Sequence, residues 1–152
     1  MKTYTTQYLL ELHFKRPLFS SMEKITTGED VNQYIRENID SGLLNHKEFF
    51  WIILLTRSNK VLGMKEISSG KTHSTTISFK EIAQTAILAN ACGCVLVHNH
   101  PSGNLKPSDS DESITKQAGK VLHLIDVTLL DHVIVTEESY YSFVQNNHII
   151  SP

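Results

Sequence analysis

Features that would mark a membrane protein, a secreted protein or a basic nucleic-acid-binding protein are scarce in this sequence. It has only two cysteines, too few for a structural zinc site closed by thiolates. Lys and Arg total 14 against 16 Asp and Glu, so no basic surface for DNA or an anionic membrane is evident. No apolar run is long enough to span a bilayer, and the opening MKTYTTQYLLELHFKR lacks a signal-peptide core and cleavage site. We therefore expect a cytoplasmic protein without membrane contact.

The two cysteines, Cys92 and Cys94, alternate within a strand-like stretch that would direct both side chains to the same face. Neighbours at this spacing rarely form a disulfide, and intracellular thiols stay reduced. Free cysteine packs as a small hydrophobic residue. We interpret the pair as buried and inert rather than as metal ligands.

The hydrophobic pattern predicts a mixture of strands and helices. Alternating or short bounded apolar runs predict strands at 8–14, 49–55, 61–70, 93–97 and 128–136. Helical spacing predicts helices at 29–39, 79–90 and 109–124, with a short last helix at 139–147. In the second of these, Ile82, Ala83, Ala86 and Ile87 are expected on one buried face.

The length and order of these elements predict the fold class. A chain of 152 residues is near the usual size of one domain and can bury a core without crosslinks. Strands and helices do not alternate strictly, which favours an α/β fold of the α+β type, with a mixed β-sheet flanked by helices. We expect a single domain over residues 1–152, with its core at about 28–145.

A predicted metal site follows the strand at 93–97. His98 and His100 are two residues apart, so strand alternation sends both imidazoles to one side. Asp111 falls in the first turn of the next predicted helix. Two imidazoles and a carboxylate are typical of catalytic zinc, which keeps a fourth position for water. We predict Zn2+ bound by His98, His100 and Asp111.

Each part of this pattern also has a simpler interpretation. Ser108 and Asp111 form a Ser-x-x-Asp pattern that commonly begins a helix. One or two histidines in a loop are often only solvated or hydrogen-bonded. The complete string, His-x-His-Pro and then Ser-x-x-Asp in one strand-to-helix loop, favours the metal site over a helix cap alone.

The string HNHPSGNLKPSDSD resembles the JAMM (MPN+) metalloprotease motif, in which His-x-His is followed after seven residues by Ser-x-x-Asp. The segments HNHPSG, PS-x-x-D and LLDHVIV resemble more narrowly the RadC branch of that superfamily. The resemblance covers about residues 48–143. It implies the cytidine-deaminase-like JAB/MPN architecture and a zinc-dependent hydrolase.

The same resemblance implies catalytic residues. JAMM enzymes place a glutamate on an earlier strand as the general base, and Glu48 at the head of EFFWIILL matches it. By itself, Glu48 would be an ordinary exposed carboxylate at a strand end, and Glu66 is the alternative base. Ser108 would stabilise the tetrahedral oxyanion.

Asp131 and His132 lie in the segment DHVIV that resembles RadC proteins. Either could give a hydrogen bond that fixes a ligand imidazole. Strand alternation sends them to opposite faces, so at most one should face the zinc, and a structural role is open for both. The other histidines are interpreted as non-ligands: His13, His46, His73, His123 and His148.

The chain departs from the family pattern in two places. From its length we expect no N-terminal helix-hairpin-helix region, the DNA-binding element of full-length RadC proteins. Phe79, Lys80 and Glu81 replace the usual Pro-Arg-Glu, and lysine lacks the bidentate geometry of arginine. The eukaryotic isopeptidases of the superfamily use inserted segments to grip ubiquitin, for which this chain has no spare length, so we expect specificity to come from a homodimer or a partner.

Three functions follow from these observations. The leading hypothesis is a zinc metallopeptidase or isopeptidase acting on a peptide or isopeptide substrate. The alternative is a DNA repair or mobile-element accessory protein, for which Lys71, His73 and Lys80 could contact phosphates unless they form only a solvated loop. The third is a metal-binding scaffold without turnover.

Overall fold

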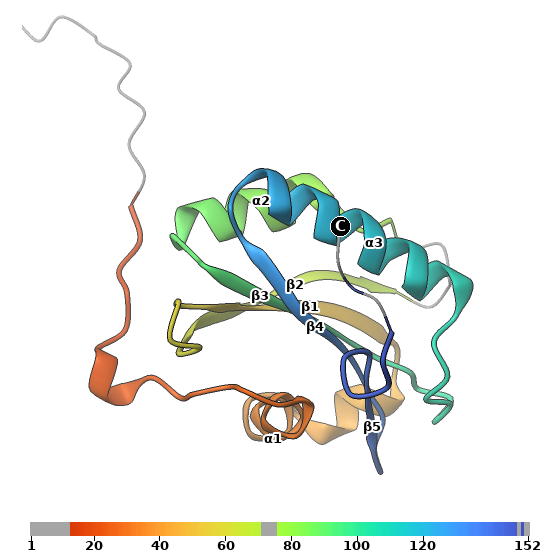
Figure 1. Cartoon of the computed structure of the whole chain (residues 1–152). Helices are drawn as coiled ribbons and strands as arrows, with labels where there is room; N and C mark the ends of the chain where they lie inside the picture. The colour runs from red at the N-terminus through yellow and green to blue at the C-terminus, as the bar shows by residue number, and fades with distance from the viewer. Residues whose placement is uncertain (1–12, 71–75, 149, 151–152) are drawn as a thin grey trace, which may run out of the picture.

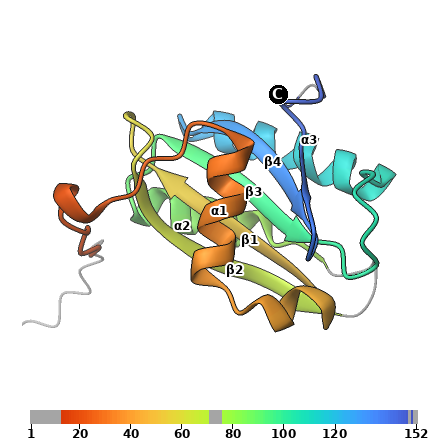
Figure 2. The same ribbon diagram turned by 90° about the horizontal axis from the view of Figure 1, so that it is seen from below.

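The computed structural model describes residues 13–70, 76–148 and 150. Three helices cover a central sheet from both sides (Figure 1). Helix α1, Gly28–Asn38, lies on one face, as the view from below shows (Figure 2). Helices α2, Phe79–Leu88, and α3, Asp109–Leu124, lie on the other face. Two short 3-10 helices, η1 at Phe19–Ser21 and η2 at Ser41–Asn45, precede the sheet.

The sheet has five strands in the order β2-β1-β3-β4-β5. They are β1 Glu48–Leu55, β2 Val61–Gly70, β3 Gly93–Asn99, β4 Thr128–Val135 and β5 Tyr140–Ser142. Only β3 and β4 run parallel, and the other neighbours are antiparallel. This arrangement confirms the predicted fold class, a mixed sheet flanked by helices.

Strands β1 and β3 are buried along almost their whole length and are apolar except at Glu48, His98 and Asn99, because helices cover both faces of the sheet. Phe50, Ile52 and Leu96 pack on the side of α2 and α3. Trp51 and Val97 pack on the side of α1. Even-numbered residues of both strands therefore face α2 and α3, and this alternation decides where the polar residues at the strand ends point.

The helices begin where the sequence places capping residues. The Thr27 side chain accepts the Asp30 backbone N–H in a capping box, and the Ser78 side chain accepts the Glu81 N–H.

One expectation for the buried face of α2 is wrong. Ile87 is 48 % exposed, because in the last turn only Ala86 still faces the sheet.

One terminal element differs from the prediction, and another is only partly described. The segment 139–147 is not a helix: Tyr140–Ser142 pairs with the edge of β4, and a turn follows. This pairing satisfies backbone groups of the edge strand, a tertiary effect that the local pattern does not contain. Of the strand predicted at 8–14, residues 8–12 lie outside the described residues, and His13 and Phe14 are irregular.

The cysteines are unpaired, as expected. Cys94 is buried among the apolar residues beneath α2 and α3, and burial raises the pKa of its thiol to about 12. Cys92 is half-buried just before β3. The high pKa keeps Cys94 protonated and unreactive at neutral pH.

None of the helices in the described ranges has the length and apolarity that crossing a membrane requires.

Candidate metal centre

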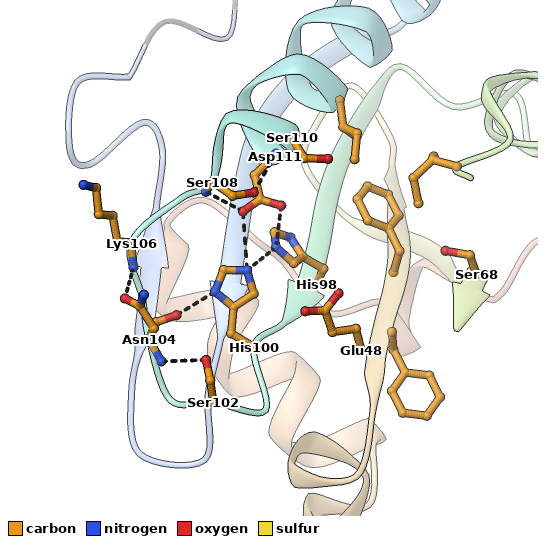
Figure 3. A pocket seen from close by; sticks show the side chains of 14 residues that line it. Glu48, Ser68, His98, His100, Ser102, Asn104, Lys106, Ser108, Ser110 and Asp111 are labelled. Atoms are coloured by element: carbon orange, nitrogen blue, oxygen red, sulfur yellow. Dashed lines mark hydrogen bonds and ion pairs between the residues drawn. The ribbon is translucent and has the colours of Figure 1, made fainter. Parts of the chain in front are cut away.

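Three side chains from β3, the loop after it and α3 converge at one end of the sheet (Figure 3). The Nε2 atom of His98 lies 3.1 Å from Oδ1 of Asp111, and the Nε2 atom of His100 lies 3.4 Å from Oδ2. The two Nε2 atoms are 2.9 Å apart. One ligand atom from each residue lies within 4.8 Å of the others. The cluster could therefore hold one metal ion.

The loop after β3 returns the chain to the cluster and orients His100. Gly103 takes a positive φ of 80°, which glycine adopts without a steric cost. The turn brings the Asn104 carbonyl to 2.6 Å from Nδ1 of His100. Since a carbonyl can only accept, Nδ1 carries the hydrogen. A neutral His100 then directs the lone pair of Nε2 toward Asp111.

Asp111 is also part of the helix cap of α3. The Ser108 hydroxyl oxygen accepts the Asp111 backbone N–H at 3.1 Å, and the Asp111 carboxylate accepts the Ser108 N–H at 2.8 Å. The sequence presents a cap and a metal site as alternatives, whereas in the structure one carboxylate caps the helix and faces both histidines. Capping thus fixes the orientation of Asp111 within the cluster.

The charges of the cluster are strongly coupled. Burial raises the pKa of Asp111, but the hydrogen bonds that the protonated imidazoles of His100 and His98 would donate outweigh burial and hold this pKa well below the usual range. For His100, burial lowers the pKa, but the protonated ring can donate to both Asp111 and the Asn104 carbonyl, and this outweighs burial and leaves the pKa raised. Asp111 is therefore ionised at neutral pH, while a proton on His100 would compete with a metal ion.

Glu48 is the first residue of β1 and lies beside the two histidines. The register pairs Phe50 with His98, so Glu48 lies opposite the position of His100 at the end of these strands. Its carboxylate points toward the imidazoles (Figure 3). Its charge is also one of the influences that raise the pKa of His100. Glu48 is thus placed to exchange a proton with a group held by the cluster.

The cluster opens into a cavity of about 170 Å³. One part of its lining is apolar, and another part is polar and includes Ser108. The apolar residues are Phe49, Phe50, Ile77 and Ile114, and the polar ones near the loop are Ser102, Asn104 and Lys106. Glu66, the alternative base, is exposed on β2 and is not among the described residues that line the cavity.

Asp131 and His132 point to opposite faces of β4. The His132 Nε2 atom lies 2.8 Å from Nδ1 of His98, and burial lowers the pKa of His132 well below its ordinary value. The Asp131 carboxylate accepts the Ser142 hydroxyl at 2.5 Å and the Val144 N–H at 3.1 Å. His132 therefore contacts the cluster, and Asp131 ties β4 to the chain after β5.

Two further polar residues support the site, and sequence reasoning did not find them. The hydroxyl oxygen of Thr115, on α3, lies 2.6 Å from Nδ1 of His132. It stands four residues after Asp111, so helical spacing could have indicated that both share a face.

Asn99 stands between the two candidate ligand histidines in the sequence, and its side chain is fully buried. Its side chain accepts the Phe49 N–H at 2.6 Å and donates to the carbonyls of Leu44 and Lys47 at 2.9 and 2.8 Å. These bonds hold the backbone on both sides of Glu48. No local signal marks them, because the partners are about fifty residues away in the chain.

The stretch that could contact phosphates, or form only a solvated loop, is partly described. Residues 71–75, which include Lys71 and His73, lie outside the described residues. Lys80 is exposed in the first turn of α2. DNA contact by this stretch stays a prediction.

Comparison with known proteins agrees with the motifs. Residues 25–148 match the family described as the RadC-like JAB domain. A UPF0758 protein of Flavobacterium johnsoniae is 39 % identical over 123 residues, covering 81 % of this chain and 52 % of the relative. That of Coprothermobacter proteolyticus is 40 % identical over 127 residues, covering 83 % and 54 %. The chain spans about half the length of these curated relatives. It belongs to the family of RadC-like JAB domains.

Proposed function

We propose that this protein is a zinc-dependent hydrolase of the JAMM type that cleaves an amide bond in a peptide or isopeptide substrate. The observation that carries the proposal is the convergence of His98, His100 and Asp111 with Glu48 at one cavity. Two imidazole nitrogens and one carboxylate suit zinc, and three protein ligands leave a position open, as in catalytic sites.

The residues of the site divide the chemistry among them. His98, His100 and Asp111 would hold the zinc ion, which when bound supplies an activated water near neutral pH and polarises a carbonyl. The Glu48 carboxylate accepts a proton from the attacking water. It then returns that proton to the nitrogen of the leaving amine as the C–N bond breaks.

Ser108 serves both as the helix cap and as an oxyanion donor in this proposal. Its oxygen uses a lone pair to accept the Asp111 N–H, so the hydroxyl keeps its hydrogen for a second partner. Ser108 lines the cavity together with Glu48. Donation to the developing oxyanion would contribute about 3 kcal/mol, as oxyanion donors do in other enzymes.

The cavity lining fits a peptide. Phe50, Ile77 and Ile114 give an apolar part that would accept a side chain. The polar loop from Ser102 to Lys106 contributes hydroxyl, amide and ammonium groups that can bind main-chain amides. A substrate with an apolar side chain beside the scissile bond is therefore favoured.

The test combines elemental analysis with hydrolysis of peptide and isopeptide substrates. We expect about one zinc per chain in the parent protein and in Glu48→Gln, because glutamine removes the base but no ligand. His100→Ala and Asp111→Ala should lose the zinc. Hydrolysis should occur in the parent alone among these four.

A matched control is Glu66→Gln, which removes an exposed carboxylate from β2. This variant should keep both zinc and activity. Full hydrolysis by Glu48→Gln, or a parent protein that takes up no zinc after reconstitution, would refute the proposal.

A further inference from the structure

His132 is buried behind the candidate metal centre, away from the cavity. Its side chain has no exposed surface, and it packs between the rings of Phe50 and Phe143 at centroid distances of 5.8 and 4.7 Å. Each ring nitrogen has one partner: His98 Nδ1 at 2.8 Å from Nε2, and the Thr115 hydroxyl at 2.6 Å from Nδ1. His132 therefore links a predicted ligand of β3 to helix α3.

The hydroxyl of Thr115 fixes the direction of these hydrogen bonds. It donates its single hydrogen to the Asp111 carbonyl at 2.6 Å, four residues earlier in α3. Toward His132 it can therefore only accept, so Nδ1 of His132 must carry a hydrogen. In the neutral ring, Nε2 of His132 is then an acceptor.

The same argument continues to His98. Because Nε2 of His132 accepts, Nδ1 of His98 donates to it, and the hydrogen of a neutral His98 is committed there. The Nε2 atom of His98 is left with a lone pair directed at Asp111 and His100. This is the tautomer that a metal ion requires.

We propose that Thr115 and His132 are positioning residues for the metal: a buried chain of hydrogen bonds from the Asp111 carbonyl through Thr115 and His132 sets the tautomer and ring orientation of His98. The inference rests on the proposed metal site. Helix α3 thus supplies one candidate ligand, the Asp111 carboxylate, and the first hydrogen bond of the series that orients a second, His98. Partners that orient metal ligands typically contribute 10–100-fold to metal affinity.

Substitution of Thr115 tests the chain directly. Thr115→Val keeps the shape and removes the hydroxyl, whereas Thr115→Ser keeps the hydroxyl and removes the methyl. We expect Thr115→Val to weaken Zn2+ binding about 10–100-fold in competition with a chelator of known affinity. Thr115→Ser should bind Zn2+ nearly as tightly as the parent.

Thr85→Val is the matched control. The Thr85 hydroxyl also donates to the carbonyl four residues earlier, that of Glu81, at 2.8 Å, but on helix α2, which carries no predicted ligand. This variant should leave Zn2+ affinity unchanged. Thermal unfolding of the metal-free variants separates a loss of fold from a loss of affinity.

Nitrogen NMR of the imidazoles tests the same chain in the unaltered protein. His132 should be neutral with its hydrogen on Nδ1, both without metal and with Zn2+, and zinc-loaded His98 should carry its hydrogen on Nδ1. A hydrogen on Nε2 of His132 would overturn the proposal. So would unchanged Zn2+ affinity in Thr115→Val, or equal weakening in the valine and serine variants.

These readouts are independent of hydrolysis. A parent protein that binds Zn2+ tightly but cleaves no amide would refute the proposed activity and leave the positioning role intact. Conversely, an active enzyme with the wrong His132 tautomer would refute only the positioning role.

Discussion

The two histidines of the candidate metal centre offer the same kind of ligand atom but are held in different ways. His98 is buried at 6 % exposure and hydrogen-bonded to a second buried histidine. His100 is half-buried beyond the end of β3 and is oriented by a loop carbonyl. One ligand therefore belongs to the hydrophobic core, and the other belongs to a loop. A change at His98 should disturb the fold as well as the site, whereas a change at His100 should disturb the site alone.

The sharpest test of this contrast is to replace each histidine by alanine. Both variants should lose bound zinc. Only His98→Ala should also lower the free energy of unfolding of the metal-free protein, by roughly 1–3 kcal/mol, because it leaves the His132 nitrogen buried without its partner. Chemical denaturation with metal removed gives both values. Equal destabilisation by the two variants would contradict the distinction.

Asn99 lies between the two histidines and points to the opposite face. Asn99→Ala would leave the Phe49 N–H and the Leu44 and Lys47 carbonyls without this partner, at a cost of roughly 1–3 kcal/mol per buried group that stays unsatisfied. These hydrogen bonds hold the backbone around Glu48 and not a candidate metal ligand, so the rate of hydrolysis should fall more than zinc affinity. Parallel measurements of kcat and zinc content check this, and an unchanged kcat in a folded variant would count against it.

The raised pKa of His100 predicts how zinc affinity depends on pH. A ligand must lose its proton before it binds a metal, so zinc affinity should fall as the pH drops through the raised pKa of His100, which lies above its ordinary 6.5. Asp111 adds nothing in this range, because its pKa is lowered and it stays ionised. Zinc titrations at a series of pH values measure the effect. Constant affinity across this range would contradict the assignment.

The smallest effect is expected in the loop that orients His100. In Gly103→Ala the new Cβ would have no atom within 4 Å. The substitution should therefore lower the free energy of unfolding only through the positive φ, by about 1 kcal/mol. Zinc affinity should weaken by only a few fold. The tautomer of His98, read by imidazole NMR, should not change, since its partners lie in the core. A shift at His98 would show that the two ligands are not held independently.

Much of the fold follows from local signals in the sequence. The bounds of α3 match the predicted 109–124, because Ser108 caps the helix and apolar residues recur at helical spacing. The apolar run of β1 is equally clear. The segment 139–147 was predicted incorrectly, because its strand depends on the edge of β4 rather than on its own residues.

In the candidate site, too, some residues could be predicted from local spacing and others could not. The spacing of His98, His100 and Asp111 indicated which side chains would meet, since alternation and the first helical turn are local geometry. Among the partners of these residues, His132 was one of two candidates that the sequence offered, whereas Thr115 and Asn99 were not predicted. Thr115 and Asn99 act through contacts with His132 and Leu44, and the sequence does not show which distant segments lie side by side.

The antiparallel pairing of β1 with β3 has a consequence for folding kinetics. Phe50 and His98 are neighbours in the sheet but are separated by the hairpin to β2 and by all of α2. Closing such a long loop lowers the conformational entropy of the chain before the strand contacts can stabilise it. This pairing should therefore form late in folding. Glu48 and the histidines meet only after that step. Uptake of zinc during refolding would therefore report when β1 and β3 pair. Bound zinc would also lower the rate of unfolding.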